Sequence, residues 1–86
     1  MTYAVVWSLI AVQQLGRVLA AAADPLAVER AAAFMEYMLR RHPSDMGESR
    51  SPGFRVWYED VLGLYYRIDD AALRVEILFA GPARRH

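Results

Sequence analysis

The sequence contains no cysteine and no lysine, and it has only two histidines. Without cysteine the chain has no disulfide, no thiolate ligand for zinc and no thiol nucleophile. The histidines, His42 and His86, lie far apart and outside any HExxH-type spacing, so we expect no metal and no cofactor. The ten cations are all arginines and balance ten acids. This zero net charge argues against binding nucleic acid by bulk electrostatic attraction.

An apolar run long enough to cross a membrane is also missing. The uncharged stretch from Met1 to Gly16 is shorter than the roughly 20 residues that a membrane span needs. It has no positively charged start, and Gln13 and Gln14 interrupt its apolar part, which is not typical of a signal peptide. We therefore expect a cytoplasmic protein with no membrane partner. Its length and apolar content predict one globular domain over residues 1–86.

The first half of the chain predicts a strand followed by two helices. Tyr3–Trp7 is rich in β-branched and aromatic residues, which predicts a strand buried on both faces. Ser8 is suited to cap the next helix. Asp24 and Pro25 predict the start of a second helix, which runs to about Arg41. The two helices should form an antiparallel hairpin. The apolar stripe expected on the first helix comprises Leu9, Val12, Leu15, Leu19 and Ala22.

After a predicted loop over residues 42–53, the apolar period changes from helical to two. Asp60-Val61 and Asp69–Ala71 predict turns, so the strands should form an antiparallel meander. The expected fold class is α+β: a two-layer β-α-α-β-β-β domain in which the first strand joins the sheet and the hairpin covers its apolar face. The residues expected on that face are Phe54, Val56 and Tyr58, then Leu62, Leu64, Tyr66 and Ile68, then Leu73, Val75, Ile77 and Phe79.

The opposite face of the predicted sheet carries the candidate binding residues. An outward-facing Trp57 favours contact with a partner, because Trp is a common interface anchor. Together with the sheet edges it also favours a homodimer. The alternative is a solvated face with cross-strand Arg/Glu pairs, each worth about 0.2 to 1 kcal/mol. Alternation places on this face Arg55, Trp57, Tyr65, Arg67, Arg74 and Glu76.

A series of short motifs follows in order along nearly the whole chain. They are YAVVWS before a helix, Gly47 within MGESR, Gly53-Phe54-Arg55, the run Tyr65–Asp69, and the late stretch VEILFAGPARR. In this order and spacing they resemble the RelE/ParE superfamily of bacterial toxins, the toxic halves of type II toxin-antitoxin pairs. The resemblance implies the α+β fold, a small antitoxin protein that wraps the sheet or the helical hairpin, and an essential target.

The resemblance implies one of two targets. The ParE-like branch inhibits DNA gyrase by binding, whereas the RelE-like branch cleaves messenger RNA on the ribosome with basic residues around the phosphate. The gapless spacing from Gly53 through Ile68 is closer to the ParE-like pattern, and Gly63 stands where the RelE-like branch carries a catalytic arginine. We therefore expect a toxin that acts by binding.

The ribonuclease alternative stays open and implies its own residues. In it, arginines stabilise the phosphate and a histidine moves protons, with catalytic roles for Arg55, Arg67, Arg85 and His86. A third alternative is a diverged, non-toxic protein-binding module, which the zero net charge favours over approach to ribosomal RNA. The expected binding residues are Arg50, Arg55, Trp57, Tyr65, Arg67, Arg74 and Arg84.

Overall fold

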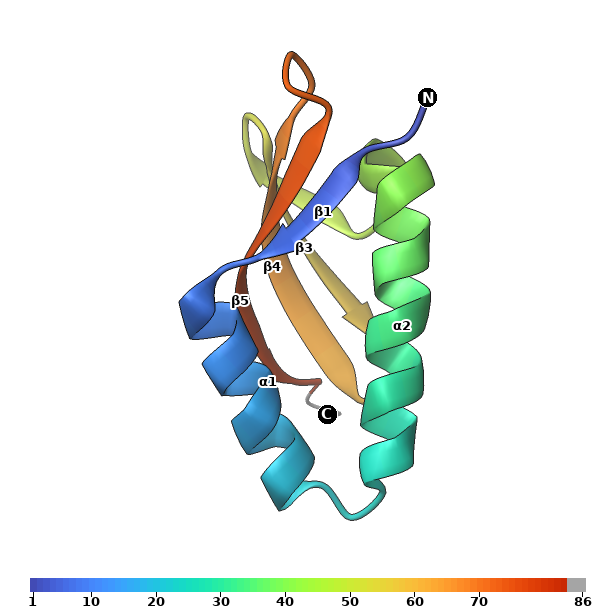
Figure 1. The fold of residues 1–86 in the computed structure, drawn as a ribbon, viewed down its shortest axis with the longest axis vertical. Helices are drawn as coiled ribbons and strands as arrows, with labels where there is room; N and C mark the ends of the chain where they lie inside the picture. Colours follow the sequence, from blue (N-terminus) through green and yellow to red (C-terminus); the bar gives the residue numbers. More distant parts are fainter. Residues whose placement is uncertain (84–86) are drawn as a thin grey trace.

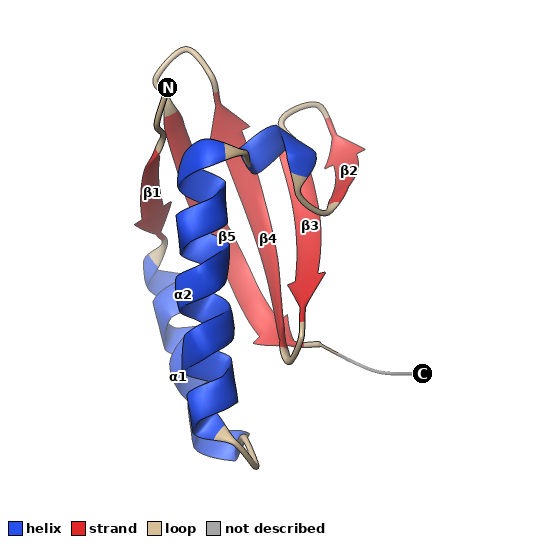
Figure 2. Ribbon diagram, turned by 90° about the vertical axis from the view of Figure 1, so that its right-hand side faces the viewer, coloured by secondary structure: helices blue, strands red, loops and turns tan. Residues whose placement is uncertain are grey.

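The structure is a computed structural model, and it describes residues 1–83. Its elements follow in the order β1 (Ala4–Trp7), α1 (Leu9–Ala21), α2 (Pro25–Arg41), a 3-10 turn (Pro43–Asp45), β2 (Glu48–Ser51), β3 (Phe54–Glu59), β4 (Leu62–Asp69) and β5 (Arg74–Pro82). The strands form one sheet in the order β1-β5-β4-β3-β2 (Figures 1 and 2). Only the β1-β5 pair is parallel within the described sheet. The predicted α+β class is confirmed.

Local capping sets both helix starts, as predicted. The Ser8 hydroxyl accepts a hydrogen bond from the Ala11 N–H (3.0 Å), and Asp24 Oδ1 accepts one from the Ala27 N–H (3.2 Å). Each bond satisfies an N–H group that the first turn of a helix leaves without a partner. Pro25 occupies the first position of α2, where no N–H is needed.

Helix α1 runs beside the sheet edge, not over its face. Strand β1 pairs only with the first half of β5, from Arg74 to Ile77. Beyond it, the Ser8 hydroxyl donates to the Leu78 carbonyl (2.9 Å), and Gln14 Oε1 accepts from the Ala80 N–H (2.8 Å). Side chains of α1 thus satisfy backbone groups of β5 where the sheet has no further strand. The two helices consequently diverge from each other in Figure 1.

The core lies between one face of β3, β4 and β5 and the helices, with α2 contributing most of the helical side chains and α1 contributing Ala11. In Figure 2, α2 stands against the sheet along most of its length. Burying apolar side chains there supplies the main stabilising free energy of so small a chain. The buried residues are Ala11, Val28, Ala31, Met35, Leu39, Trp57, Leu62, Leu64, Tyr66, Val75, Ile77 and Ala80.

The predicted loop over residues 42–53 was wrong in one respect, because it contains strand β2. Residues 48–51, ESRS, are all exposed and show no apolar alternation, so the sequence carries no burial signal for a strand. The strand exists through backbone pairing with β3, where Glu48 faces Val56 and the register shifts between Ser49 and Ser51. A sheet of five strands results, one more than predicted.

The prediction assigned the wrong set of alternating side chains in β3 to the core. Trp57 is only 8% exposed and belongs to the core, whereas Tyr58 is 62% exposed. Since Trp57 pairs with the buried Leu64 and Val56 pairs with Tyr65, the odd-numbered side chains of β3 face α2. Phe54, Val56 and Tyr58 therefore lie on the face away from the helix.

Partway along β5, the alternation of its side chains between the two faces of the sheet shifts by one residue. Tyr66 pairs with Ile77 but its neighbour Tyr65 pairs with Phe79, so Leu78 is an extra residue at a β-bulge. Beyond the bulge, Phe79 faces outward and Ala80 faces the core. The prediction that Phe79 belongs to the apolar face was wrong for this reason. The predicted placement of Leu73 in the strand was also wrong, because this residue lies in the preceding turn with φ of 51°.

Two further burial predictions were wrong. Strand β1 is not buried on both faces, since Ala4 and Val6 are exposed. Of the predicted stripe on α1, Leu9 and Val12 are exposed because this helix sits at the sheet edge. The turns at 60–61 and 70–73 are close to those predicted. Among the described helices, none has both the length and the apolar character to cross a membrane.

Gly47 generates a stability prediction. Its φ is +61°, and a Cβ added there would lie 2.1 Å from the Val56 carbonyl oxygen. Gly47→Ala should therefore lower the free energy of unfolding by about 2 kcal/mol or more, as measured by urea denaturation. Gly16→Ala is the matched control: Gly16 lies within α1 with no atom within 4 Å of its added Cβ, and the change should stabilise by roughly 0.5 to 1 kcal/mol. Equal effects of the two changes would contradict this account.

Candidate binding surface on the open face of the sheet

The face of the sheet turned away from α2 is the candidate site, and we call it the open face. No helix of the described chain covers it (Figure 2). The strand registers bring together here side chains from β3, β4 and β5. Its members are Phe54, Val56, Tyr58, Gly63, Tyr65, Arg67, Arg74, Glu76, Phe79 and Gly81.

Three aromatic rings cross the open face from strand to strand. The Phe54 and Tyr65 ring centroids are 5.9 Å apart with the planes at 20°, and those of Tyr65 and Phe79 are 6.0 Å apart at 31°. We call Phe54, Tyr65 and Phe79 the aromatic row. Phe79 is 48% exposed. Large apolar side chains that are left this accessible and lie side by side are typical of a contact surface.

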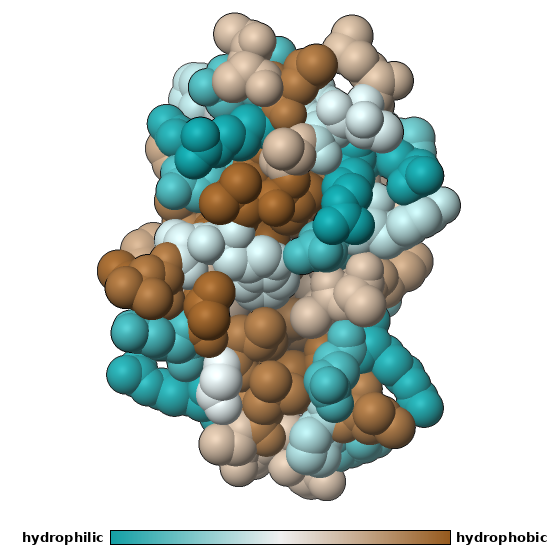
Figure 3. All heavy atoms as spheres, in the orientation of Figure 1, coloured by the Kyte–Doolittle hydropathy of each residue, from teal (hydrophilic) through white to brown (hydrophobic). Residues whose placement is uncertain are grey.

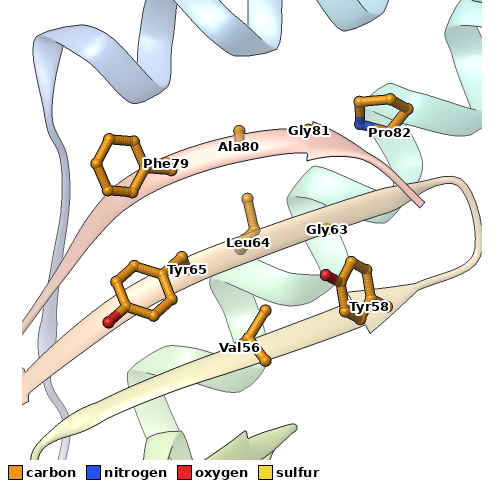
Figure 4. A pocket seen from close by; sticks show the side chains of 9 residues that line it. All are labelled: Val56, Tyr58, Gly63, Leu64, Tyr65, Phe79, Ala80, Gly81 and Pro82. Atoms are coloured by element: carbon orange, nitrogen blue, oxygen red, sulfur yellow. The ribbon is translucent and has the colours of Figure 1, made fainter. Parts of the chain in front are cut away.

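Next to the aromatic row is a shallow depression of about 240 Å³ with a floor of two glycines. Gly63 and Gly81 face each other on β4 and β5 (Figure 4). A Cβ on Gly63 would lie 2.6 Å from Tyr58 Cδ1, so the Tyr58 ring packs directly over that glycine. Tyr58 and Phe79 border this hollow.

The other end of the open face carries charges of both signs. Arg67 Nη2 donates to Glu76 Oε1 at 3.1 Å, and Asp69 and Arg74 lie beside this pair. Both partners are partly exposed, so the pair contributes about 0.2 to 1 kcal/mol. The cross-strand Arg/Glu pair expected for a solvated face is therefore present. Two arginines and two acids leave this end without an excess of positive charge.

The structure confirms only part of the predicted positions. Tyr65, Arg67 and Arg74 lie on the open face as expected. Arg50 lies on the edge strand β2, where its guanidinium pairs with Glu48 at 3.1 Å. Trp57 was wrongly placed, since its ring lies in the core 6.2 Å from that of Phe34. The predicted residues Arg84, Arg85 and His86 lie outside the described residues.

Arg55 was also wrongly placed, and the structure gives it a different partner. On the helix side of β3, its Nε donates to the Met46 carbonyl (2.7 Å) and its Nη2 to the Gly47 carbonyl (3.1 Å). Charge-assisted bonds of this kind hold the loop before β2 against the sheet. The Arg55 guanidinium therefore does not face the aromatic row, and it is not available there for a phosphate.

Tyr66 completes the same arrangement from the neighbouring strand. Its hydroxyl lies 2.9 Å from the Pro43 carbonyl oxygen and 3.0 Å from that of Met46, and donates to this pair. We call Arg55, Tyr66 and these loop carbonyls the carbonyl clasp. Burial raises the pKa of Tyr66 to about 12, although the nearby Arg55 charge acts in the opposite direction.

The described open face suits contact better than acid-base chemistry. Cleavage of RNA requires a base, an acid and cations around the phosphate. The described face offers aromatic rings and an Arg67 that is already paired. Within the described residues no cluster of potential metal ligands is found either. Sequence reasoning missed Phe54, Tyr58 and Phe79, because simple alternation assigned them to the core.

Comparisons with known proteins identify the fold. No family model and no curated protein matches the sequence. Among solved structures, a chain of the Mycobacterium tuberculosis toxin-antitoxin complex RelBE2 is 24% identical with a TM-score of 0.78, covering 96% of this chain and 100% of that one. The Pseudomonas aeruginosa ParDE system matches at 14% identity and a TM-score of 0.70, over 96% and 98% of the two chains. The isolated Escherichia coli RelE toxin matches at 14% and 0.69, over 98% and 87%.

These likenesses show that the chain has the fold shared by RelE and ParE toxins, as the motifs in its sequence implied. They extend over almost the whole chain. At such identities they carry no information on which of the activities this chain has.

The carbonyl clasp generates a pH prediction. Since the folded-state pKa of Tyr66 lies above the ordinary tyrosine value of 10.0, its stabilising contribution is complete below pH 10. It is then lost as the pH rises towards about 12. Tyr66→Phe should remove this part of the pH dependence and cost about 1 kcal/mol at neutral pH, because the loop carbonyls lose a donor. Urea midpoints measured from pH 8 upwards test both effects.

Tyr3→Phe is the matched control for this experiment. The pKa of Tyr3 is also raised, by its hydrogen bond to Asp70 at 2.6 Å, but this contact is exposed. The Tyr3→Phe chain should keep the Tyr66 decline at alkaline pH. An unchanged alkaline decline in the Tyr66→Phe chain would show that the clasp has no such role.

Proposed function

We propose that this protein is the toxin of a type II toxin-antitoxin pair, and that it inhibits an essential target by stoichiometric binding, in the manner of ParE. The observation that carries the toxin assignment is the end-to-end match to a chain of the RelBE2 complex, with 96% of one chain and 100% of the other aligned. One domain over residues 1–86 performs this function in the bacterial cytoplasm.

The open face supports binding over cleavage. Its accessible centre is apolar, with Tyr58 62% and Phe79 48% exposed. Aromatic side chains of this kind are the usual energetic centre of a protein interface, while the charged residues form its rim. The target therefore packs against Tyr58, Tyr65 and Phe79, and Arg74 contributes at the rim. DNA gyrase is the target that this mode of action implies.

The antitoxin occupies a different surface in this proposal. Helix α2 exposes Leu26, Phe34 and Tyr37, each about half accessible, although they are large and apolar. Near the joined ends of the two helices, a hollow of about 470 Å³ lies between them and the end of the sheet, and its lining includes Val18, Ala21, Val28, Val61 and Pro82. An antitoxin segment lays its apolar face over the exposed side chains of α2 in this proposal, and burying them stabilises the complex.

A RelE-like ribonuclease is the second candidate. The observation that favours it is the aromatic row, because stacked rings on a sheet can hold successive nucleotide bases. In that case Arg67 would contact the phosphate, and the predicted Arg85 and His86 would have to supply the remaining chemistry. The third candidate, a non-toxic binding module, would use the same apolar surfaces without arresting growth.

Controlled expression in a bacterial host tests the proposal. Induction of the native chain should arrest growth, and the double variant Tyr58→Ser with Phe79→Ser should relieve the arrest. Loss of two central interface aromatics weakens binding on the order of 30-fold or more. Tyr37→Ser is the matched control, because Tyr37 is 50% exposed on α2 and should leave toxicity unchanged in the absence of antitoxin.

Two further measurements separate the candidates. Inhibition of gyrase supercoiling by the purified chain supports the proposal, whereas cleavage of translated messages establishes the ribonuclease instead. Folding of each variant is checked by its urea midpoint. A native chain that accumulates folded and leaves growth unaffected would refute the toxin assignment in that host and favour the non-toxic module.

A further inference from the structure

Tyr58 on β3 and Gly63 on β4 are direct partners across the open face. Farther along the same two strands, the Ile68 N–H donates to the Gly53 carbonyl at 2.7 Å. Hydrogen-bonded and non-hydrogen-bonded pairs alternate along an antiparallel ladder, so Tyr58 and Gly63 form a non-hydrogen-bonded pair. In such a pair the two Cα atoms come closest together, which brings the Tyr58 side chain within reach of Gly63.

The Tyr58 ring occupies the space that a side chain at position 63 would need. A Cβ added to Gly63 would lie 2.6 Å from both Cδ1 and Cε1 of Tyr58. The backbone itself does not require a glycine there, because the described glycines with positive φ are Gly47 and Gly53. The Tyr58 ring is therefore the reason why position 63 has to be a glycine.

The same contact determines where the Tyr58 ring lies. Tyr58 is 62% exposed and does not belong to the core, so the packing of the core does not fix its ring. Lying over Gly63, the ring extends from β3 across β4 and borders the depression whose other side is formed by Phe79 (Figure 4). A side chain at position 63 would push the ring off β4 and leave the core unchanged.

We propose that Gly63 is a positioning residue of the target-binding surface. Its missing side chain lets the Tyr58 ring lie across β4, and this placement fixes the side of the ring that meets the target. The inference rests on the proposed function, in which the target packs against Tyr58, Tyr65 and Phe79. A ring that is already in place loses less conformational freedom on binding and so contributes more to affinity. Gly63 acts through Tyr58 and does not need to touch the target.

Stability and binding respond differently to the loss of this glycine. A glycine inside a strand is unfavourable for folding, because it loses more backbone freedom than other residues. An aromatic ring that covers the glycine from the neighbouring strand offsets part of this cost. Gly63→Ala removes the cost and the covering ring together, so the two effects on stability oppose each other. A positioning role thus predicts a large loss of binding with little change in stability.

Inhibition of gyrase supercoiling by the purified chain and its variants tests this role. Gly63→Ala should raise the half-inhibitory concentration about fivefold or more, the loss expected for one central interface aromatic, while its urea midpoint stays close to the native value. In a chain that already carries Tyr58→Ser, Gly63→Ala should have no further effect, because the ring that it displaces is gone. In a chain that carries Tyr58→Phe it should keep its full effect, because that ring is displaced as well.

NMR spectroscopy reports the ring position without any target. The Tyr58 ring should shift the Hα resonances of Gly63 upfield, and Tyr58→Ser should return them to the range of an ordinary glycine. Gly81→Ala is the matched change on the neighbouring strand: its added Cβ has no atom within 4 Å, so the upfield shift at Gly63 should persist. Gly63 resonances without this shift in the native chain would overturn the proposal.

Two control variants lie away from Tyr58. Figure 3 shows further apolar patches over β1 and the helices. Leu9→Ser removes a side chain that is 73% exposed at the start of α1, and Gly16→Ala adds a methyl group to a glycine in open space on the same helix. Both variants should inhibit gyrase as the native chain does, since neither changes the open face.

Failure of this inference is distinguishable from failure of the proposed function. A native chain that inhibits gyrase, with a folded Gly63→Ala chain that inhibits equally well, would overturn the role of Gly63 and leave the proposed function standing. Additive losses from Gly63→Ala and Tyr58→Ser would also overturn it, because Gly63 would then not act through Tyr58. A native chain without activity on gyrase would instead refute the proposed target, and the role assigned to Gly63 with it.

Discussion

Which side chains of β3 and β4 face the helix depends on three backbone carbonyls after α2 that need hydrogen-bond donors. The carbonyls of Pro43, Met46 and Gly47 belong to the segment between α2 and β2. Arg55 and Tyr66 donate to them, and these two residues sit directly opposite each other on β3 and β4. The Tyr66 bond to Pro43 is buried, where a carbonyl without a donor is costly, and the register in which both side chains face the loop satisfies all three carbonyls.

This requirement decides what the open face presents. With Arg55 turned towards the loop, alternation brings Trp57 into the core. The same alternation turns Phe54, Val56 and Tyr58 outward, where Phe54 meets Tyr65. The open face therefore presents aromatic rings and glycines in place of an arginine and a tryptophan. A face of this composition is suited to apolar contact with a partner and less to binding a phosphate.

The short β1 has a comparable influence on the other side of the molecule. Because β1 covers only the first half of β5, the remaining edge is satisfied by side chains from the α1 segment, and α1 is thereby drawn away from α2. Near their joined ends, the helices and the end of the sheet enclose the hollow lined by Val18, Val28 and Val61.

The sequence by itself determined the features that depend on near neighbours. Ser8 and Asp24 start the helices through bonds to residues three positions on, and β4 alternates cleanly because Leu62, Leu64 and Tyr66 are all apolar. The motifs were sufficient to predict the toxin fold. Only the tertiary structure decided the phase of β3, the existence of β2 and the bulge at Leu78. Both faces of β3 contain aromatic residues, so alternation alone is ambiguous there. The choice is made by hydrogen bonds and strand pairs that join distant residues, and such partners leave no periodic signal in the sequence.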